Sequence, residues 1–378
     1  MMDRGLRMIP VNEPLLDGNE ARYLGECIVS GWISADGAFV EKFENGMAEQ
    51  MNRRYAVSVA NGTAALDIAV ASLKIGPGDE VILPAHTIIS CAAAVVKAGA
   101  KPVLVDSDPV TWNMDVTKIE GAITPRTRAI MVVHIFGLPV DMDPVIELAS
   151  RYGIPIIEDA AQAIGLTYKG RPCGSFGAIS CLSFYSNKNI TTGEGGMVLC
   201  NDEALHARAK SLRNLCFMPK RRFIHEELGW NYRMSNLQAA VGLAQLESLT
   251  RHTLRKRQIG HRYGRLLHDV AGLELSPPSE PYGESIFWVY GLILKDDIPL
   301  SGDEARAHLA ELGVDTRPFF WPMHEQPVFR KMGLFTDERY PIAERMGRRG
   351  FYLPSGLALT DEKQDRVVGA VRQLMESL

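Results

Sequence analysis

Between residues 55 and 210, short β-branched and apolar runs alternate regularly with segments that have a helical pattern. The apolar runs are continuous, which is typical of strands covered on both faces. Strands that alternate with helices favour a mostly parallel sheet wrapped by helices. The expected strands are 55–60, 80–83, 102–105, 129–134, 155–158, 178–184 and 196–200. The clearest helical segments between them are 63–73, 88–97, 144–152 and 203–212.

The C-terminal part of the chain has a different pattern. Residues 236–270 have a helical pattern with a leucine stripe, and proline and glycine then become frequent before a strand-like run at 287–294. A chain of 378 residues is long enough for one large domain and a smaller one. We therefore expect a large α/β domain over residues 1–250, including an N-terminal arm, and a smaller α+β domain over residues 251–378.

Composition excludes several classes of protein. The net charge of -4 disfavours a nucleic-acid binder that depends on phosphate contacts. No run approaches the roughly 18 to 20 apolar residues of a transmembrane helix, and the first residues lack the apolar stretch of a signal peptide. The six cysteines have no metal-ligand spacing, and several lie in apolar runs that suit core positions. We thus expect a cytoplasmic protein without nucleic-acid, membrane or metal partners.

Two polar motifs follow expected strands, at the sheet edge where the ligands of parallel sheets gather. Asn61-Gly62-Thr63-Ala64 opens a helix whose free amides and threonine hydroxyl suit a phosphate, although ordinary helix capping explains the same residues. Glu158-Asp159 ends another strand, where a carboxylate can keep a pyridinium nitrogen protonated. Gln162 can donate a hydrogen bond to a phenolic oxygen. The alternative explanation of this motif is a helix cap at the strand end, but a cap would need only one acid and no glutamine.

A single lysine, Lys188, lies between an apolar strand and a glycine-rich loop at 193–196. An isolated lysine in such a place is usually solvated. Partial burial, however, lowers the pKa of a lysine amine and lets it form a Schiff base with a carbonyl cofactor. Ser183, at the end of the same strand, can reach the phosphate of that cofactor. A phosphate site, a pyridinium partner and such a lysine together indicate pyridoxal 5'-phosphate (PLP).

Three longer motifs occur in the same order along the chain. They are Glu-Asp-Ala-Ala-Gln at 158–162, Lys188 with Thr-Thr-Gly-Glu-Gly-Gly at 191–196, and Gly-Trp-Asn-Tyr-Arg-Met-Ser-Asn at 229–236. With these motifs the chain resembles the DegT-type sugar-nucleotide aminotransferases, over nearly its full length. The resemblance implies the fold type I aminotransferase architecture, with a mostly parallel seven-stranded sheet covered by helices. It also implies PLP as cofactor, with pyridoxamine 5'-phosphate as its amino form.

The resemblance implies a role for each matched residue. Lys188 carries the cofactor and moves protons, Asp159 pairs with the ring nitrogen, and Gln162 lies beside the ring oxygen. In this family one phosphate contact comes from the partner subunit, and Asn231 matches it, which implies at least a homodimer and leaves a tetramer open. The cofactor residues implied are Gly62, Thr63, Ala64, Ile88, Asp159, Gln162, Ser183, Lys188 and Asn231.

The resemblance also implies the substrates. Segments 31–34, 106–112 and 317–324 are similar to those of members that move an amino group from L-glutamate to C4 of GDP-4-keto-6-deoxy-D-mannose, in the synthesis of O-antigen sugars. A dTDP- or UDP-linked 3- or 4-ketosugar stays open, because related members share these segments in part. The substrate residues implied are Trp32, Ser34, Tyr185, Glu194, Arg233, Arg317 and His324.

One position departs from the family pattern. Where Ile88 stands, the family usually has an aromatic residue stacked on the cofactor ring. Isoleucine can pack on that face but offers no π overlap. Either Tyr185 or Phe184 is therefore expected to take its place, or the ring is held less firmly.

Two other functions are alternatives. A PLP-dependent sugar dehydratase of the same fold would have histidine in place of Lys188, which argues against that activity. A cofactor-bound regulatory protein without turnover would be expected to carry a DNA-binding module, for which the sequence leaves no room. A cofactor absorbance band that shifts on addition of glutamate would distinguish the enzyme from such a sensor.

Overall fold

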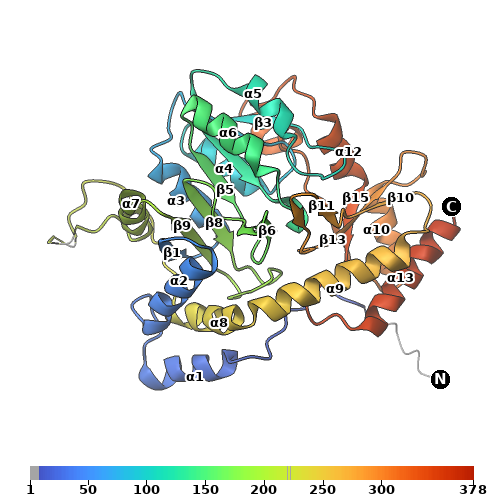
Figure 1. Ribbon diagram of the computed structural model, residues 1–378, viewed down its shortest axis with the longest axis horizontal. Helices are drawn as coiled ribbons and strands as arrows, with labels where there is room; N and C mark the ends of the chain where they lie inside the picture. The colour runs from blue at the N-terminus through green and yellow to red at the C-terminus, as the bar shows by residue number, and fades with distance from the viewer. Residues whose placement is uncertain (1–7, 219, 222) are drawn as a thin grey trace.

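The computed structural model describes residues 8–218, 220–221 and 223–378; residues 1–7, part of the expected large domain, lie outside the described residues. A seven-stranded sheet forms the centre of the molecule (Figure 1). Each of the seven strands expected from the sequence is present, within two residues at each end. In spatial order they are β1 (Tyr55–Val59), β9 (Gly196–Cys200), β8 (Ile179–Ser183), β5 (Ile156–Asp159), β4 (Thr127–Val133), β2 (Glu80–Pro84) and β3 (Lys101–Val105).

The direction of the strands decides where ligands can gather. Strands β8, β5, β4, β2 and β3 are parallel, whereas β9 is antiparallel to both of its neighbours. Residues 184–195 join β8 to β9 without a helix, so the two strands pair like a long hairpin, with Ser183 opposite Gly196. Val59, at the end of β1, also pairs with Gly196. The carboxyl ends of β1, β5 and β8 therefore meet at one edge, which also carries the segment with Lys188.

Helices cover both faces of this sheet, which explains the continuous apolar runs. Successive strand residues point to opposite faces. In β2, Val81 and Leu83 belong to the core shared with α3 (Gly62–Ser72) and α4 (Ile89–Lys97). Ile82 between them belongs to the core shared with α2 (Ala38–Gln50) and α6 (Met142–Tyr152). Both faces of the sheet are thus buried.

A second, four-stranded sheet lies in the C-terminal part of the chain (Figure 1). Helix α9 (Leu249–Leu267) runs from the region of the large sheet to this one and adds Ile259, Tyr263 and Leu267 to its core. The strand order is β10 (Leu273–Leu275), β13 (Tyr290–Leu294), β15 (Gly350–Leu353) and β14 (Arg317–Pro318). The domain division between residues 250 and 251, which falls in the first turn of α9, stays a prediction.

The N-terminal helices pack near the end of the large sheet. Both α1 (Glu20–Ser30) and α2 contact α8 (Asn236–Glu247), which begins with a capping box formed by Ser235 and Gln238. The remaining helices are α5 (Ile119–Ala122), α7 (Glu203–Arg213), α10 (Gly302–Glu311), α11 (Pro327–Lys331), α12 (Pro341–Arg349) and α13 (Asp361–Glu376). The shorter elements are η1 (Val116–Lys118), η2 (Ile135–Gly137), η3 (Met323–Glu325), β6 (Thr167–Tyr168), β7 (Arg171–Pro172), β11 (Ser279–Glu280) and β12 (Gly283–Glu284).

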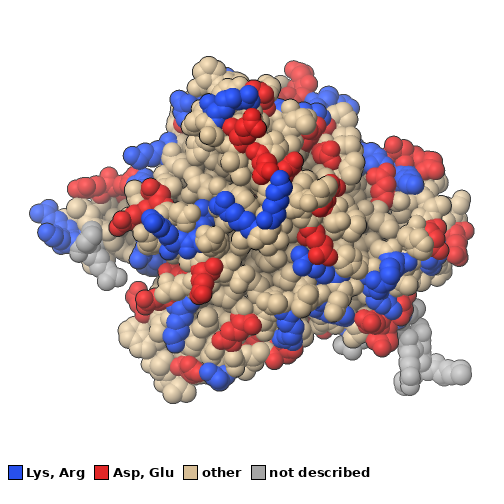
Figure 2. All heavy atoms as spheres, viewed as in Figure 1, with Lys and Arg blue, Asp and Glu red and all other residues tan. Residues whose placement is uncertain are grey.

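The surface carries both signs of charge. Figure 2 shows basic and acidic side chains interspersed over one face. Exposed ion pairs contribute to this pattern, such as Arg151 with Glu120. Within residues 8–218, 220–221 and 223–378, every helix is too short or too polar to span a bilayer.

Candidate active site

A cavity of about 640 Å³ opens at the sheet edge where β1, β5 and β8 end. Its wall includes the first turn of α3, the end of β5 and the segment that joins β8 to β9. Trp288, Phe320 and Tyr352 from the C-terminal part of the chain complete it. The predicted residues that line it are Gly62, Thr63, Ala64, Ile88, Asp159, Gln162, Ser183, Tyr185, Lys188 and Glu194.

The amine of Lys188 lies over an aromatic ring. Its Nζ is 3.7 Å from the centroid of the Trp288 ring. Burial lowers the pKa of the Lys188 amine to about 7, and the carboxylate of Asp159 only partly opposes this shift. A large share of the amine is therefore unprotonated near neutral pH, and this is the form that attacks a carbonyl carbon.

Asp159 ends β5 and is almost fully buried. Its Oδ1 accepts the backbone N–H of Ala161 at 3.0 Å, and its Oδ2 accepts the thiol of Cys91 at 3.1 Å. Burial raises the pKa of this carboxyl, because two uncharged donors replace only part of the lost hydration. A cationic group of a ligand would stabilise the ionised form, so this end of the cavity favours a positive charge.

The first turn of α3 presents backbone amides to the cavity. Asn61 caps the helix, and its side chain accepts the N–H of Ala64 at 2.8 Å. The amides of Gly62 and Thr63 precede the first intrahelical bonds, so they remain available to an anion. The hydroxyl of Thr63 is 2.8 Å from that of Ser90 on α4. The cap therefore engages the amide of Ala64, while the amides of Gly62 and Thr63 suit a phosphate.

Gln162 is fixed by a neighbouring loop. Its Oε1 accepts the backbone N–H of Phe136 at 2.7 Å. Because a backbone N–H can only donate, the side-chain oxygen must face Phe136. The NH₂ group is then left as a donor for a ligand oxygen in the cavity.

Behind the cavity, Glu158 holds the end of β5 from the opposite face of the sheet. It is fully buried and accepts a hydrogen bond from His134 Nε2 at 3.0 Å. It also forms an ion pair with Arg53, whose Nη2 lies 3.9 Å away. His134 Nδ1 accepts the N–H of Val140 at 3.1 Å, so the ring carries its proton on Nε2 and donates it to Glu158. Burial alone would raise the pKa of Glu158, but its donors outweigh that effect and lower it. Backbone amides also donate to this carboxylate, from Gly174, Phe176 and Gly177.

Glu158→Gln is expected to lower the free energy of unfolding by about 3 kcal/mol at pH 7, because it leaves the buried Arg53 guanidinium without its carboxylate. The folded-state pKa of Glu158 is depressed, so its stabilisation is present above the unfolded value near 4.5 and is lost at lower pH. Urea denaturation at pH 7 and pH 4 measures both effects. Glu120→Gln, which breaks the exposed pair with Arg151, is the control and should cost under about 0.5 kcal/mol. Equal stabilities of the two variants would contradict the prediction.

The predicted residues that do not line the cavity are Trp32, Ser34, Asn231, Arg233, Arg317 and His324. Trp32 and Ser34 are exposed in the loop before α2. Arg233 Nη1 donates to Asn214 Oδ1 at 2.8 Å, and Asn231, also exposed, forms a backbone bridge with Asn214. Arg317 is exposed on β14. None of the six lines the cavity of Lys188 in its own chain, although Arg317 lines an adjoining pocket with Asn187 and Trp288.

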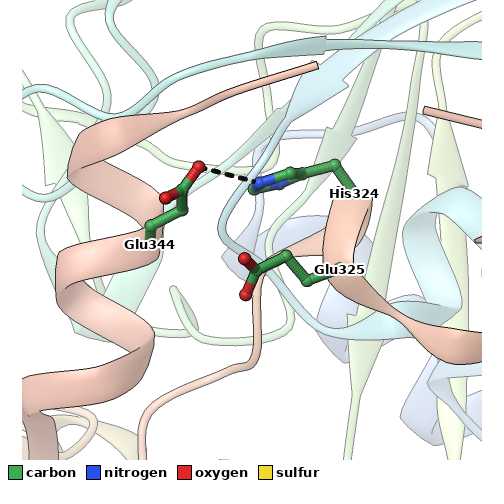
Figure 3. Close-up of side chains that lie close together, drawn as sticks. All are labelled: His324, Glu325 and Glu344. Atoms are coloured by element: carbon green, nitrogen blue, oxygen red, sulfur yellow. Dashed lines mark hydrogen bonds and ion pairs between the residues drawn. The ribbon is translucent and has the colours of Figure 1, made fainter. Parts of the chain in front are cut away.

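His324 belongs to a separate buried cluster, shown in Figure 3. Its Nε2 lies 3.1 Å from Oε1 of Glu344 on α12, and Glu325 points into the same space. The three side chains could offer ligand atoms to a metal. However, Arg348 donates to Glu325 at 2.6 Å, and Arg339 lies 3.1 Å from Glu344. The arginines balance both carboxylates, and the cluster ties η3 to α12.

Some residues of the cavity have no counterpart among the predicted ones. Trp288 lies under Lys188, but in sequence it belongs to a strand-like run that does not indicate a place in the active site. Cys91 resembles an ordinary core cysteine in sequence, yet it bonds Asp159. Of the two aromatic residues expected to compensate for Ile88, Tyr185 lines the cavity. Phe184 is instead fully buried against Phe43, with ring centroids 5.0 Å apart.

Comparison with known proteins gives consistent results. The DegT/DnrJ/EryC1/StrS aminotransferase family matches residues 14–372. The chain is 42% identical to GDP-perosamine synthase of Caulobacter vibrioides, over 98% of this chain and 99% of the relative. It is 41% identical to GDP-perosamine synthase of Escherichia coli O157:H7, over 95% of this chain and 96% of that relative. The crystal structure of the aminotransferase TlmJ from Streptoalloteichus hindustanus has a TM-score of 0.91 at 31% identity, over 98% and 99% of the two chains.

These similarities extend over nearly the whole chain and include the large sheet that forms the site. They confirm the fold type I architecture and the PLP dependence expected from the sequence. They also agree with an enzyme that uses an amino donor and a nucleotide sugar. The chain belongs to the DegT/DnrJ/EryC1/StrS aminotransferase family and is a PLP-dependent aminotransferase.

Proposed function

We propose that the enzyme transfers the amino group of L-glutamate to C4 of GDP-4-keto-6-deoxy-D-mannose and so forms GDP-perosamine, a sugar of O-antigen polysaccharides. One observation carries the proposal: a single cavity joins Lys188, Asp159 and the free amides of α3. The chain with this cavity is 42% identical to a GDP-perosamine synthase along almost its full length.

The residues of the cavity fit PLP. The amides of Gly62 and Thr63, with the Ser183 hydroxyl, would hold the phosphate at the positive end of α3. The buried carboxylate of Asp159 would pair with the protonated ring nitrogen, and Lys188 would hold the cofactor through its amine. Bound PLP supplies an electron sink for the carbon that loses its proton.

Lys188 then acts as the base and acid of the reaction. Its amine, with a pKa of about 7, takes a proton from one carbon and returns it to another. The face of the Trp288 ring stabilises the ammonium form between these two steps. Trp288 is itself buried, so it also keeps water away from the amine.

Gly62→Ala is expected to weaken PLP binding about tenfold, or about 1.4 kcal/mol. A Cβ at position 62 would lie 2.9 Å from the Cβ of Ser183, which is fixed on β8, so the first turn of α3 must move away from the phosphate. Titration of the apoprotein with PLP, followed by absorbance, measures the affinity. Gly121→Ala is a matched control, because its Cβ would meet nothing within 4 Å. Unchanged PLP affinity in the position-62 variant would count against this phosphate site.

The substrate assignment is tested with a panel of nucleotide sugars. The purified enzyme is incubated with L-glutamate and GDP-, dTDP- or UDP-linked ketosugars, and release of 2-oxoglutarate is measured. We expect the highest kcat/KM with GDP-4-keto-6-deoxy-D-mannose and a product aminated at C4. Faster turnover of a dTDP- or UDP-linked sugar, or amination at C3, would replace this assignment.

We also propose a homodimer with shared active sites, in the cytoplasm. Asn231 is exposed and lies outside the cavity of its own chain, which supports a role in the cavity of a partner subunit. All six cysteines are free and buried, which supports a reducing compartment. Light scattering across a dilution series, with activity measured in parallel, tests the assembly. A fully active monomer would exclude shared sites.

A further inference from the structure

Helix α9 places two buried side chains against the segment that carries Lys188. His252 and Lys256 are one turn apart on the same face of the helix. His252 Nδ1 donates to the carbonyl of Asn189, the residue after Lys188, at 3.0 Å. Lys256 Nζ donates to the carbonyls of Trp288 and Ser355, each at 2.6 Å. The helix therefore holds both the lysine segment and the tryptophan beneath it.

Trp288 connects the two lysines. Its backbone carbonyl accepts Lys256, and its ring Nε1 donates to the carbonyl of Asn187, the residue before Lys188, at 3.0 Å. The ring face lies 3.7 Å from Lys188 Nζ. The indole is thus fixed at its backbone and at its ring nitrogen, and its position sets that of the amine.

Lys256 is an unusual residue for a merely structural position. Its side chain is only 3% exposed, and its acceptors are two uncharged carbonyls. A buried lysine without a carboxylate is costly, and an apolar side chain would fill the same space at lower cost. Burial lowers the pKa of Lys256 to about 7, with a smaller contribution from the charge of Lys188. The charged residues that line the cavity with Lys188 are Asp67, Lys97, Asp159 and Glu194, and of these Asp159 acts on the pKa of its amine.

We propose that Lys256 is a positioning residue for the amino transfer: it holds Trp288 under Lys188 and so keeps the Lys188 amine in its buried place. The proposal rests on the role of Lys188 as the proton-transferring residue. Lys256 itself does not line the cavity and, by this proposal, does not touch the substrate.

The test uses the apoprotein, so that it depends on neither the cofactor nor the sugar. Lys188 is labelled with trinitrobenzenesulfonate between pH 5 and 10, and the labelled peptide is quantified by mass spectrometry. We expect half-maximal labelling near pH 7 in the wild type. In Lys256→Met the midpoint should rise by about one pH unit, because a Trp288 ring that is no longer held lets water reach Lys188 and relieves the burial that lowers its pKa. Lys256→Gln should fold more readily, since its amide still donates to a carbonyl, and should show a smaller rise in the same direction.

Gln364→Leu provides the matched control. Gln364 is fully buried on α13 and donates to the carbonyl of Ile259 on α9 at 2.8 Å, so its loss also removes a buried hydrogen bond of that helix. We expect its labelling midpoint to equal that of the wild type. An unchanged midpoint in the Lys256 variants, or an equal shift in the control, would overturn the proposal. Failure of the sugar panel would leave this readout unaffected, so the two hypotheses are tested separately.

Discussion

Lys188→Ala is expected to abolish amino transfer, with kcat/KM lowered by at least about 10⁴-fold. The substitution removes the amine that holds the cofactor and also the group that moves the proton. Lys256 does not replace it, because its amine is bonded to two carbonyls and does not line the cavity. Release of 2-oxoglutarate from glutamate in the presence of the ketosugar measures the loss.

The control for this variant is Lys169→Ala. Lys169 is exposed and pairs with Asp143, and neither residue lines the cavity. We expect wild-type turnover in the control, because an exposed ion pair contributes little to stability. Normal turnover by the Lys188 variant itself would refute the assignment of the site.

Asp159→Asn is expected to lower kcat/KM roughly 10³-fold. Asparagine fits the space and can still accept the N–H of Ala161, but it cannot keep a pyridine nitrogen protonated. The effect on the apoprotein has the opposite sign. Since burial raises the folded-state pKa of Asp159, the ionised carboxylate destabilises the empty protein at pH 7. The apo variant should therefore unfold at the same temperature as the wild type or higher.

Calorimetry of the apo and PLP-loaded forms measures both effects. In the wild type, PLP should raise the unfolding temperature more than in the variant, because only the wild type gains the ionic pair. Asp143→Asn, in the exposed pair with Lys169, should change neither activity nor this difference. A variant with full activity, or with a less stable apoprotein, would contradict the interpretation of Asp159.

The large sheet could be predicted because its signals are local. A run such as β5 is apolar along its whole length and ends in two carboxylates, and both features can be recognised without knowledge of the fold. Lys188 and Thr63 were predictable for the same reason, since each follows a strand whose carboxyl end must lie at the ligand-binding edge.

The residues that the sequence did not indicate depend on contacts between distant segments. Trp288 reaches Lys188 only because the second sheet packs against the edge of the first, and Lys256 faces the same region only because α9 spans both. Local patterns identified the chemistry of the site, whereas tertiary packing decides which groups support it.

The order of Glu158 and Asp159 on β5 has a consequence for how this gene can change. The two acids are chemically alike, yet alternation along the strand sends one to the arginine behind the sheet and the other to the cavity. A point substitution elsewhere in β5 leaves this arrangement intact. Insertion or deletion of a single codon before Glu158 would slip the strand by one residue and exchange the two faces. A change in the length of β5 would therefore disrupt the site even where every side chain is kept.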